Sequence, residues 1–121
     1  MVKTTPFLAK GAKDIFVYNA SDTPTNCEPG VTRRVLAYND KTMMCEIRFE
    51  KGAKGNMHSH PHTQVTYIVK GSFAFTVDGE TKVVNQGDTV LMPSGSLHGC
   101  ECLEEGILCD VFTPMREDFI K

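Results

Sequence analysis

Three of the four histidines in this 121-residue chain lie at alternate positions, His58, His60 and His62, and Gln64 takes the next alternate position. In an extended strand, alternate side chains point to the same face, so His58, His60 and Gln64 are predicted to face one interior. Neighbouring imidazoles suit a divalent transition metal, which binds nitrogen at about 2.0–2.1 Å. A further ligand would come from another strand, where His98 is the remaining histidine.

Two qualifications apply to this histidine run. Pro61 interrupts regular strand pairing, so we expect His62 to lie at a rim or in a loop and not to bind metal. His58 and His60 could also be ordinary surface histidines in a loop, because a single H-x-H pattern is short.

The elements that must position these residues are predicted to be short strands. Segments rich in β-branched and aromatic residues end repeatedly at Gly, Pro, Asn or Asp. They are VTRRVLAYND, KTMMCEIRFEKG, TQVTYIVKG, SFAFTVDGE, TKVVNQG, DTVLMPSG, LHGCECLEEG and ILCDVFTP. Phe73, Phe75 and Val77 alternate with smaller residues, and Asp78-Gly79 predicts a tight hairpin turn. The pattern predicts an all-β sandwich or barrel.

Length and composition fit one domain. The chain is 40% hydrophobic and 23% charged, which is ordinary for a globular protein. We expect residues 1–30 to form an N-terminal arm and loop, because Asn19–Gly30 is dense in turn formers. Residues 31–121 would form the barrel, and the only helix-like piece is the C-terminal TPMREDFIK.

Several classes of partner are disfavoured. A net charge of −2 and the lack of a lysine or arginine run give no footprint for nucleic acid. No segment resembles a signal peptide or a membrane span of about 20 apolar residues. The five cysteines are an odd number without the spacing of a disulfide framework, which predicts a cytoplasmic protein.

The histidine run belongs to a longer pattern. The stretch GAKGNMHSHPHTQVTYIVKG resembles the first motif of the cupin family, which is a glycine, five residues, H-x-H, three or four residues, an acidic residue, six residues and a glycine. Gly52, His58, His60, Gln64 and Gly71 occupy those positions. Gln64 stands where glutamate is usual.

A second stretch, GDTVLMPSGSLHGCEC, resembles the second cupin motif. Gly87, Pro93, Gly95 and His98 match it, and Cys102 stands where asparagine is usual. Two motifs in order are far more specific than H-x-H alone, so they disfavour the interpretation of His58 and His60 as surface histidines.

The run HPHTQ, the residues LHGC and the tail DVFTPMREDF resemble the KdgF group of cupins, from about Val31 to the end of the chain. The resemblance implies a cupin double-stranded β-helix, that is, a conical β-barrel or jelly-roll, and a homodimer. It implies one divalent metal per chain, nickel or zinc foremost, with manganese or iron as alternatives. It also implies ring opening of 4,5-unsaturated uronates from pectin or alginate to 5-keto-4-deoxyuronates, so the partner would be a small sugar acid.

The same resemblance implies roles for particular residues. The metal ligands would be His58, His60, Gln64 and His98. Asp110, Phe112 and Arg116 would line the substrate site, with Asp110 moving a proton and Arg116 binding the uronate carboxylate through two hydrogen bonds. Phe112 would pack on the sugar or exclude water. The alternatives are an exposed strand aspartate, a core phenylalanine, and an arginine paired with Glu117 or Asp118.

The neutral amide of Gln64 limits the kinds of reaction that the predicted metal site would support. A neutral amide leaves the metal charge uncompensated and cannot act as a base, which favours Asp110 for proton transfer and disfavours oxygen chemistry. Burial would raise the pKa of Asp110, whereas a nearby metal would lower it.

Cys100 and Cys102 share the parity of His98, so they could bind metal or be small buried apolar residues. Another metal-dependent cupin enzyme, either a dioxygenase or a small-molecule isomerase, and a non-catalytic sugar-binding cupin are the competing interpretations.

Overall fold

The computed structural model describes residues 15–18 and 23–120, and nearly all of its regular structure is β-strand. The strands are β1 (Thr25–Asn26), β2 (Val31–Asn39), β3 (Thr42–Phe49), β4 (Lys54–His58), β5 (Thr63–Val77), β6 (Glu80–Asn85), β7 (Thr89–Met92) and β8 (His98–Thr113). A single 3₁₀ turn, η2 (Glu117–Phe119), follows β8. The all-β class predicted from the sequence is confirmed.

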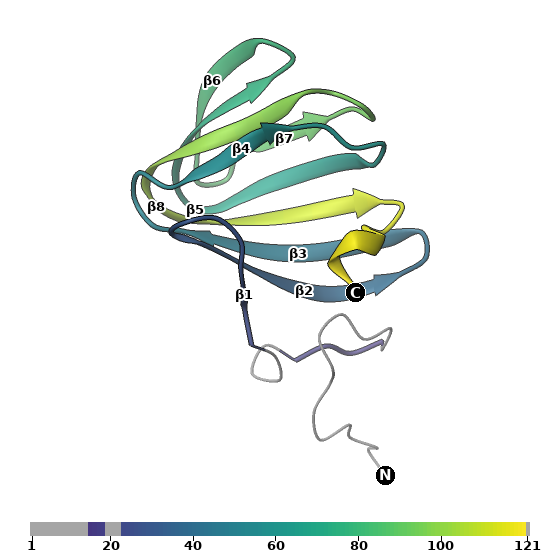
Figure 1. Ribbon diagram of the computed structural model, residues 1–121. Helices are drawn as coiled ribbons and strands as arrows, with labels where there is room; N and C mark the ends of the chain where they lie inside the picture. Colours follow the sequence, from purple (N-terminus) through teal and green to yellow (C-terminus); the bar gives the residue numbers. More distant parts are fainter. Residues whose placement is uncertain (1–14, 19–22, 121) are drawn as a thin grey trace.

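The strands pair antiparallel in one curved sheet, shown in Figure 1, with the order β1-β2-β3-β8-β5-β6. β4 pairs with β8, and β7 pairs with β5. The two long strands, β5 and β8, run through both halves of the sheet. The end of β8 lies between β3 and the start of β5, whereas the start of β8 lies between β4 and the end of β5.

β5 changes its inward face half-way along. Its alternating buried positions are Gln64, Thr66 and Ile68 before the change and Phe73 and Phe75 after it, with Ser72 also buried at the change itself. The pairing register with β8 shifts between these two sets. The shift lies at Gly71, whose φ of 90° favours glycine and where a Cβ would come within 2.6 Å of the Glu105 carbonyl oxygen. The sequence predicted two strands separated at this glycine; the structure has one bulged strand.

The inward faces of the strands form the core. Its most buried members come from β2, β3, β5, β7 and β8 and include Val35, Met43, Cys45, Ile68, Phe73, Met92 and Cys102. The predicted alternation of Phe73 and Phe75 toward the core is confirmed. The predicted turn is confirmed as well, because Asp78 and Gly79 both have positive φ between β5 and β6, as a type I′ turn requires.

Like β5, β8 joins two predicted segments, LHGCECLEEG and ILCDVFTP, into one strand. Two further elements were not predicted as strands. β4, with the sequence KGNMH, was not predicted, because it lacks the β-branched and aromatic residues that mark strands. The expected loop Asn19–Gly30 contains β1, which pairs with β2. Residues 1–14 and 19–22 of the expected arm lie outside the described residues, so the boundary at residue 30 stays a prediction.

The remaining general predictions concern the cysteines and the membrane. All five cysteines are free thiols, as their odd number and spacing indicated. In the described part of the chain, no helix is long and apolar enough to cross a membrane.

Candidate metal centre and active site

Three histidines meet at one point inside the curved sheet. One ligand atom from each of His58, His60 and His98 lies within 4.8 Å of the others. The ring centroids of His58 and His98 are 4.5 Å apart, and those of His60 and His98 are 4.8 Å apart. His60 and His98 are buried, whereas His58 is exposed, so the cluster keeps one side open to a ligand.

The histidines do not converge for the reason that alternate spacing suggested. His58 ends β4, His60 lies in the connection after it, and Gln64 is on β5. The three side chains face one interior, as predicted, although no single strand carries them. His58 faces His98 because β4 pairs directly with β8 at these two residues. The convergence is therefore a product of strand pairing and of the turn at Pro61.

Backbone carbonyls fix the orientation of all three rings. Nδ1 of His58 lies 2.7 Å from the Asn56 carbonyl oxygen, Nδ1 of His60 lies 3.0 Å from that of His62, and Nδ1 of His98 lies 3.1 Å from that of Ser96. A carbonyl oxygen only accepts, so each Nδ1 carries the proton. A neutral imidazole with its proton on Nδ1 presents Nε2 as an unprotonated nitrogen, which is the form that binds metals.

The geometry fits a metal ion. Two atoms bound to one ion at about 2.1 Å lie at most about 4.2 Å apart, so the widest separation of 4.8 Å in the cluster closes with a small side-chain movement. Nε2 of His98 is buried without a hydrogen-bond partner in the described structure. Burial lowers the pKa of His98 to about 4 and also lowers that of His60, which favours the neutral form of both rings.

A chain of hydrogen bonds fixes Gln64. The Thr66 hydroxyl donates to Oδ1 of Asp110 at 2.6 Å, so its oxygen is free to accept from Nε2 of Gln64 at 3.0 Å. This directs the amide oxygen of Gln64 the other way, to 3.0 Å from Nε2 of His60. Because Nδ1 of His60 holds the proton, two acceptors face each other there, and a shared cation would satisfy both.

The same chain explains why position 64 carries an amide. Gln64 must offer oxygen to the histidine cluster and an N–H to Thr66. A glutamate lacks the donor and would place a second carboxylate against the hydroxyl that Asp110 already uses. We infer that glutamine is required here by the hydrogen bonds as well as by the charge of the site.

Asp110 is a buried acid in this network. Burial raises its pKa from 3.8 to about 6, while hydrogen bonds from Thr66 and Gln64 and the charge of Arg116 act in the opposite direction. It sits on β8 where that strand pairs with Thr66 of β5 and Cys45 of β3. The alternative of an exposed strand aspartate is wrong, because Asp110 is 8% exposed.

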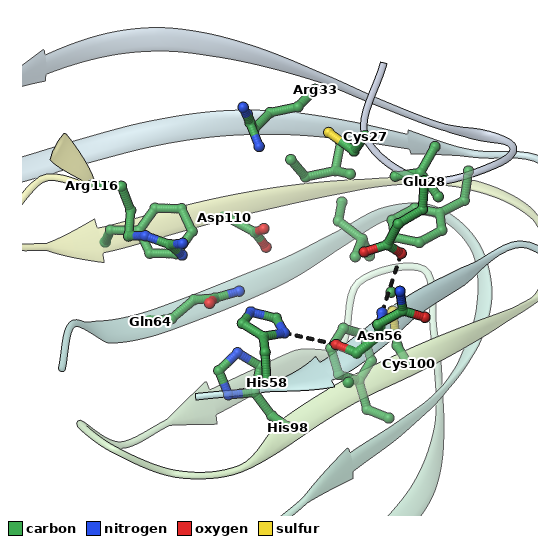
Figure 2. Close-up of a pocket in the computed structure, with 18 of the residues that line it drawn as sticks. Cys27, Glu28, Arg33, Asn56, His58, Gln64, His98, Cys100, Asp110 and Arg116 are labelled. Atoms are coloured by element: carbon green, nitrogen blue, oxygen red, sulfur yellow. Dashed lines mark hydrogen bonds between the residues drawn. The ribbon is translucent and has the colours of Figure 1, made fainter. Parts of the chain in front are cut away.

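The site opens into a cavity of about 280 Å³, a size suited to a small ligand. Figure 2 shows His58 and His98 on one side, Arg33 and Arg116 on the other, and Gln64 and Asp110 between them. Apolar side chains complete the wall, among them Ile47, Phe49, Phe75 and Leu108. The cavity therefore combines a cation site, an acid and two guanidinium groups.

Phe112 and Arg116 both line this cavity. Phe112 is 2% exposed, and its ring centroid lies 5.7 Å from that of His60. Arg116 donates from Nε and Nη2 to the two carboxylate oxygens of Asp118, at 3.0 and 2.8 Å. The paired alternative for Arg116 thus describes this structure, in which Asp118 occupies the Nε–Nη2 edge of the guanidinium.

The remaining candidates for metal ligands, His62, Cys100 and Cys102, are not part of the three-histidine cluster. His62 lies outside the three-histidine cluster, and its backbone carbonyl orients His60. Cys100 lines the cavity, but burial raises its pKa to about 12; burial also raises the pKa of Cys102. Protonated thiols are poor ligands, so both fit the interpretation of small apolar residues.

The sequence did not single out three residues of the site. Arg33, Glu28 and Asn56 all line the cavity. The Glu28 carboxylate accepts the backbone N–H of Asn56 at 3.2 Å, and the carbonyl of Asn56 orients His58. Only Arg33 had a signal, because it lies at an inward position between Val31 and Val35 of β2.

Fold and site together define a β-barrel protein with a three-histidine centre, and the chain belongs to the cupin family: residues 45–112 match its cupin domain. The resemblance to the KdgF group is confirmed by comparison. The chain is 38% identical over 93 residues to the pectin degradation protein KdgF of Dickeya dadantii (strain 3937), covering 75% of this chain and 84% of that protein.

Solved structures agree. KdgF from Halomonas sp. matches with a TM-score of 0.83 and 31% identity, covering 88% of this chain and 98% of that one. An RmlC-like cupin from Shewanella frigidimarina NCIMB 400 matches with a TM-score of 0.84 and 40% identity, covering 88% and 96%. These matches span nearly the whole of both solved chains.

Proposed function

We propose that this protein is a metal-dependent enzyme that opens 4,5-unsaturated uronate monosaccharides to 5-keto-4-deoxyuronates. The name of the Dickeya relative, a pectin degradation protein, supports a sugar acid from pectin as substrate; alginate is the other source of such monomers. The observation that carries the proposal is the hydrogen-bonded chain Gln64–Thr66–Asp110. It connects the three-histidine centre to a buried acid inside one small cavity.

A divalent metal held by His58, His60, His98 and Gln64 would supply a Lewis acid that polarises oxygens of the sugar acid. Nickel or zinc suits three imidazoles and an amide oxygen, with manganese and iron as alternatives. All four ligands are neutral, so they would leave the positive charge of the ion available to an anionic substrate.

Asp110 would move the proton. Ring opening converts the anomeric hydroxyl to an aldehyde and releases an enol at the former ring oxygen, and protonation of C4 then gives the 5-ketone. The balance is one proton moved from oxygen to carbon, with no oxidation or reduction. A carboxyl with a pKa of about 6 both accepts and returns a proton near neutral pH, which contributes about 10²–10⁴-fold to rate in typical enzymes. Addition of water before ring opening is compatible with the same residues.

Phe112 and Arg116 would shape the substrate space. Phe112 presents an apolar ring between the centre and the tail, 5.6 Å from the Phe119 ring centroid, and would exclude water from the reacting carbons. Arg116 would contribute positive charge to the cavity while Asp118 holds its position.

A direct assay tests the proposal. Lyase-generated unsaturated uronate absorbs in the ultraviolet through its conjugated double bond, and we expect the protein to remove this absorbance faster than the spontaneous reaction. Chelation of metal and Asp110→Asn should each remove the acceleration, whereas the exposed control Glu80→Gln should retain it. Oxygen uptake with ferrous iron would indicate a dioxygenase instead. Sugar binding without turnover would indicate a binding protein, and no acceleration by the intact metal-loaded protein refutes the proposal.

The predicted homodimer is also a proposal. Val65 and Tyr67 on the outer face of β5 and Leu91 on β7 are apolar and 42–58% exposed, and Val65 pairs with Leu91 in the sheet. This outer face is where we expect a second copy to bind, because its burial would remove apolar side chains from water.

A further inference from the structure

Arg33 occupies an unusual position for an arginine. It lies on β2 between Val31 and Val35, which are 5% and 2% exposed, and alternate residues of a strand share a face. Arg33 therefore points into the barrel with the core valines, and it lines the same cavity as His58 and Asp110. Figure 2 shows its guanidinium directed into this cavity, across from the histidines.

The charge of Arg33 has no carboxylate partner among the described residues. The other three arginines each pair with an acid: Arg34 and Arg48 with Glu46, and Arg116 with Asp118. Arg33 instead stacks on Phe119, with its Cζ 3.7 Å from the ring centroid, and its Nε is buried without a hydrogen-bond partner. Stacking supports the flat face of a guanidinium but leaves its N–H groups without acceptors.

Phe119 organises both arginines of the cavity. Arg116 lies 4.2 Å from the centroid of the same ring that Arg33 contacts. The two guanidinium groups differ in how many of their N–H donors remain unpaired, because Asp118 already binds the Nε and Nη2 of Arg116. An anionic ligand that enters the cavity finds unpaired N–H groups on Arg33.

We propose that Arg33 binds the carboxylate of the ligand and determines the preference of the site for acidic over neutral sugars. Arg116, whose Nε and Nη2 are held by Asp118, adds positive charge to the cavity and helps to hold Phe119. The identity of the sugar rests on the proposed function, but the class of ligand, a small molecule with a carboxylate, rests on the cavity itself. Carboxylate is the group whose planar geometry matches the free edge of a guanidinium.

Binding of galacturonate and of its neutral parent galactose tests the inference without turnover, because neither sugar has the double bond of the unsaturated substrate. We expect the metal-loaded protein to prefer galacturonate. Arg33→Gln should weaken galacturonate binding by about 10–100-fold, the usual range for a hydrogen bond to a charged group, without changing galactose binding. Arg33→Lys should retain part of the preference. Arg48→Gln, a change at an exposed arginine on β3, should behave as wild type.

Kinetics on unsaturated uronate provide a second readout, in which Arg33→Gln should raise KM by a similar factor and change kcat much less. Thermal unfolding shows whether each variant is folded, and its metal content shows whether it binds the metal. If Arg33→Gln fails either check, Arg33→Lys replaces it in both assays. Equal binding of galacturonate by Arg33→Gln and wild type, or no preference in wild type, overturns the inference. Arg33-dependent binding without ring opening would refute the proposed function alone, whereas turnover with an unchanged KM in Arg33→Gln would refute this inference alone.

Discussion

Replacement of Asp110 by asparagine should stabilise the metal-free protein at alkaline pH. The same replacement should abolish the activity of the metal-loaded protein. Burial raises the pKa of Asp110 from 3.8 to about 6, so the folded state binds this proton more tightly than the unfolded state. That contribution is fully present below pH 3.8 and is lost as pH rises through 6. At about 1.36 kcal/mol for each pKa unit, ionised Asp110 costs the folded state about 3 kcal/mol at pH 8.

Asparagine keeps the size of the side chain and an acceptor for the Thr66 hydroxyl but does not ionise. The variant should therefore unfold at a temperature about 10 °C above wild type at pH 8, and the difference should shrink to about a third of that at pH 4.5. Unfolding of both proteins in a chelator between these pH values is the assay. The exposed control Glu80→Gln should show no such pH-dependent gain.

Two outcomes would refute this reasoning. A gain of equal size at every pH would mean that packing, and not ionisation, sets the stability of the variant. A variant less stable than wild type at pH 8 would mean that the hydrogen bonds from Thr66 and Gln64 outweigh the cost of burying the charge. Addition of zinc should reduce the gain, because a nearby cation stabilises the carboxylate.

Further predictions concern the centre and the outer face. His98→Ala should weaken zinc or nickel binding at least as much as the about 10–100-fold typical of outer-shell changes, and a wild-type metal content would contradict the proposed ligand set. Thr66→Val should lower kcat by about 10-fold or more with metal retained, and should shift the acidic limb of the pH–rate profile upward because Asp110 loses a donor; recovery in Thr66→Ser is the control. Val65→Lys should convert a dimer to a monomer in light scattering, and a monomeric wild type would refute the proposed homodimer.

Most of the strands and the clustering of the three histidines could be predicted from the sequence. Regular alternation and turn residues identified β2, β3, β6 and β7, and two spaced motifs brought His58 and His98 together although 40 positions separate them in the chain. Such motifs carry information about which strands meet, whereas periodicity describes each strand alone.

The remaining features depend on pairing between distant segments. The bulge at Gly71 joins two predicted strands into one, because backbone hydrogen bonds to β8 continue on both sides of it. β4 has a weak strand propensity, and it forms because its backbone pairs with the start of β8. Arg33 shares the inward position of Val31 and Val35, but the sequence does not show that a cavity lies beneath this face to receive a guanidinium.

The tail after β8 places Arg116 and Phe119 against the cavity, yet within the described chain it adds only a 3₁₀ turn beyond the last strand. Shape and charge of the cavity wall thus depend in part on a segment whose replacement would leave every strand pair intact. Exchange of this short tail between related barrels offers a way to change which molecules are admitted while the histidine cluster stays as it is.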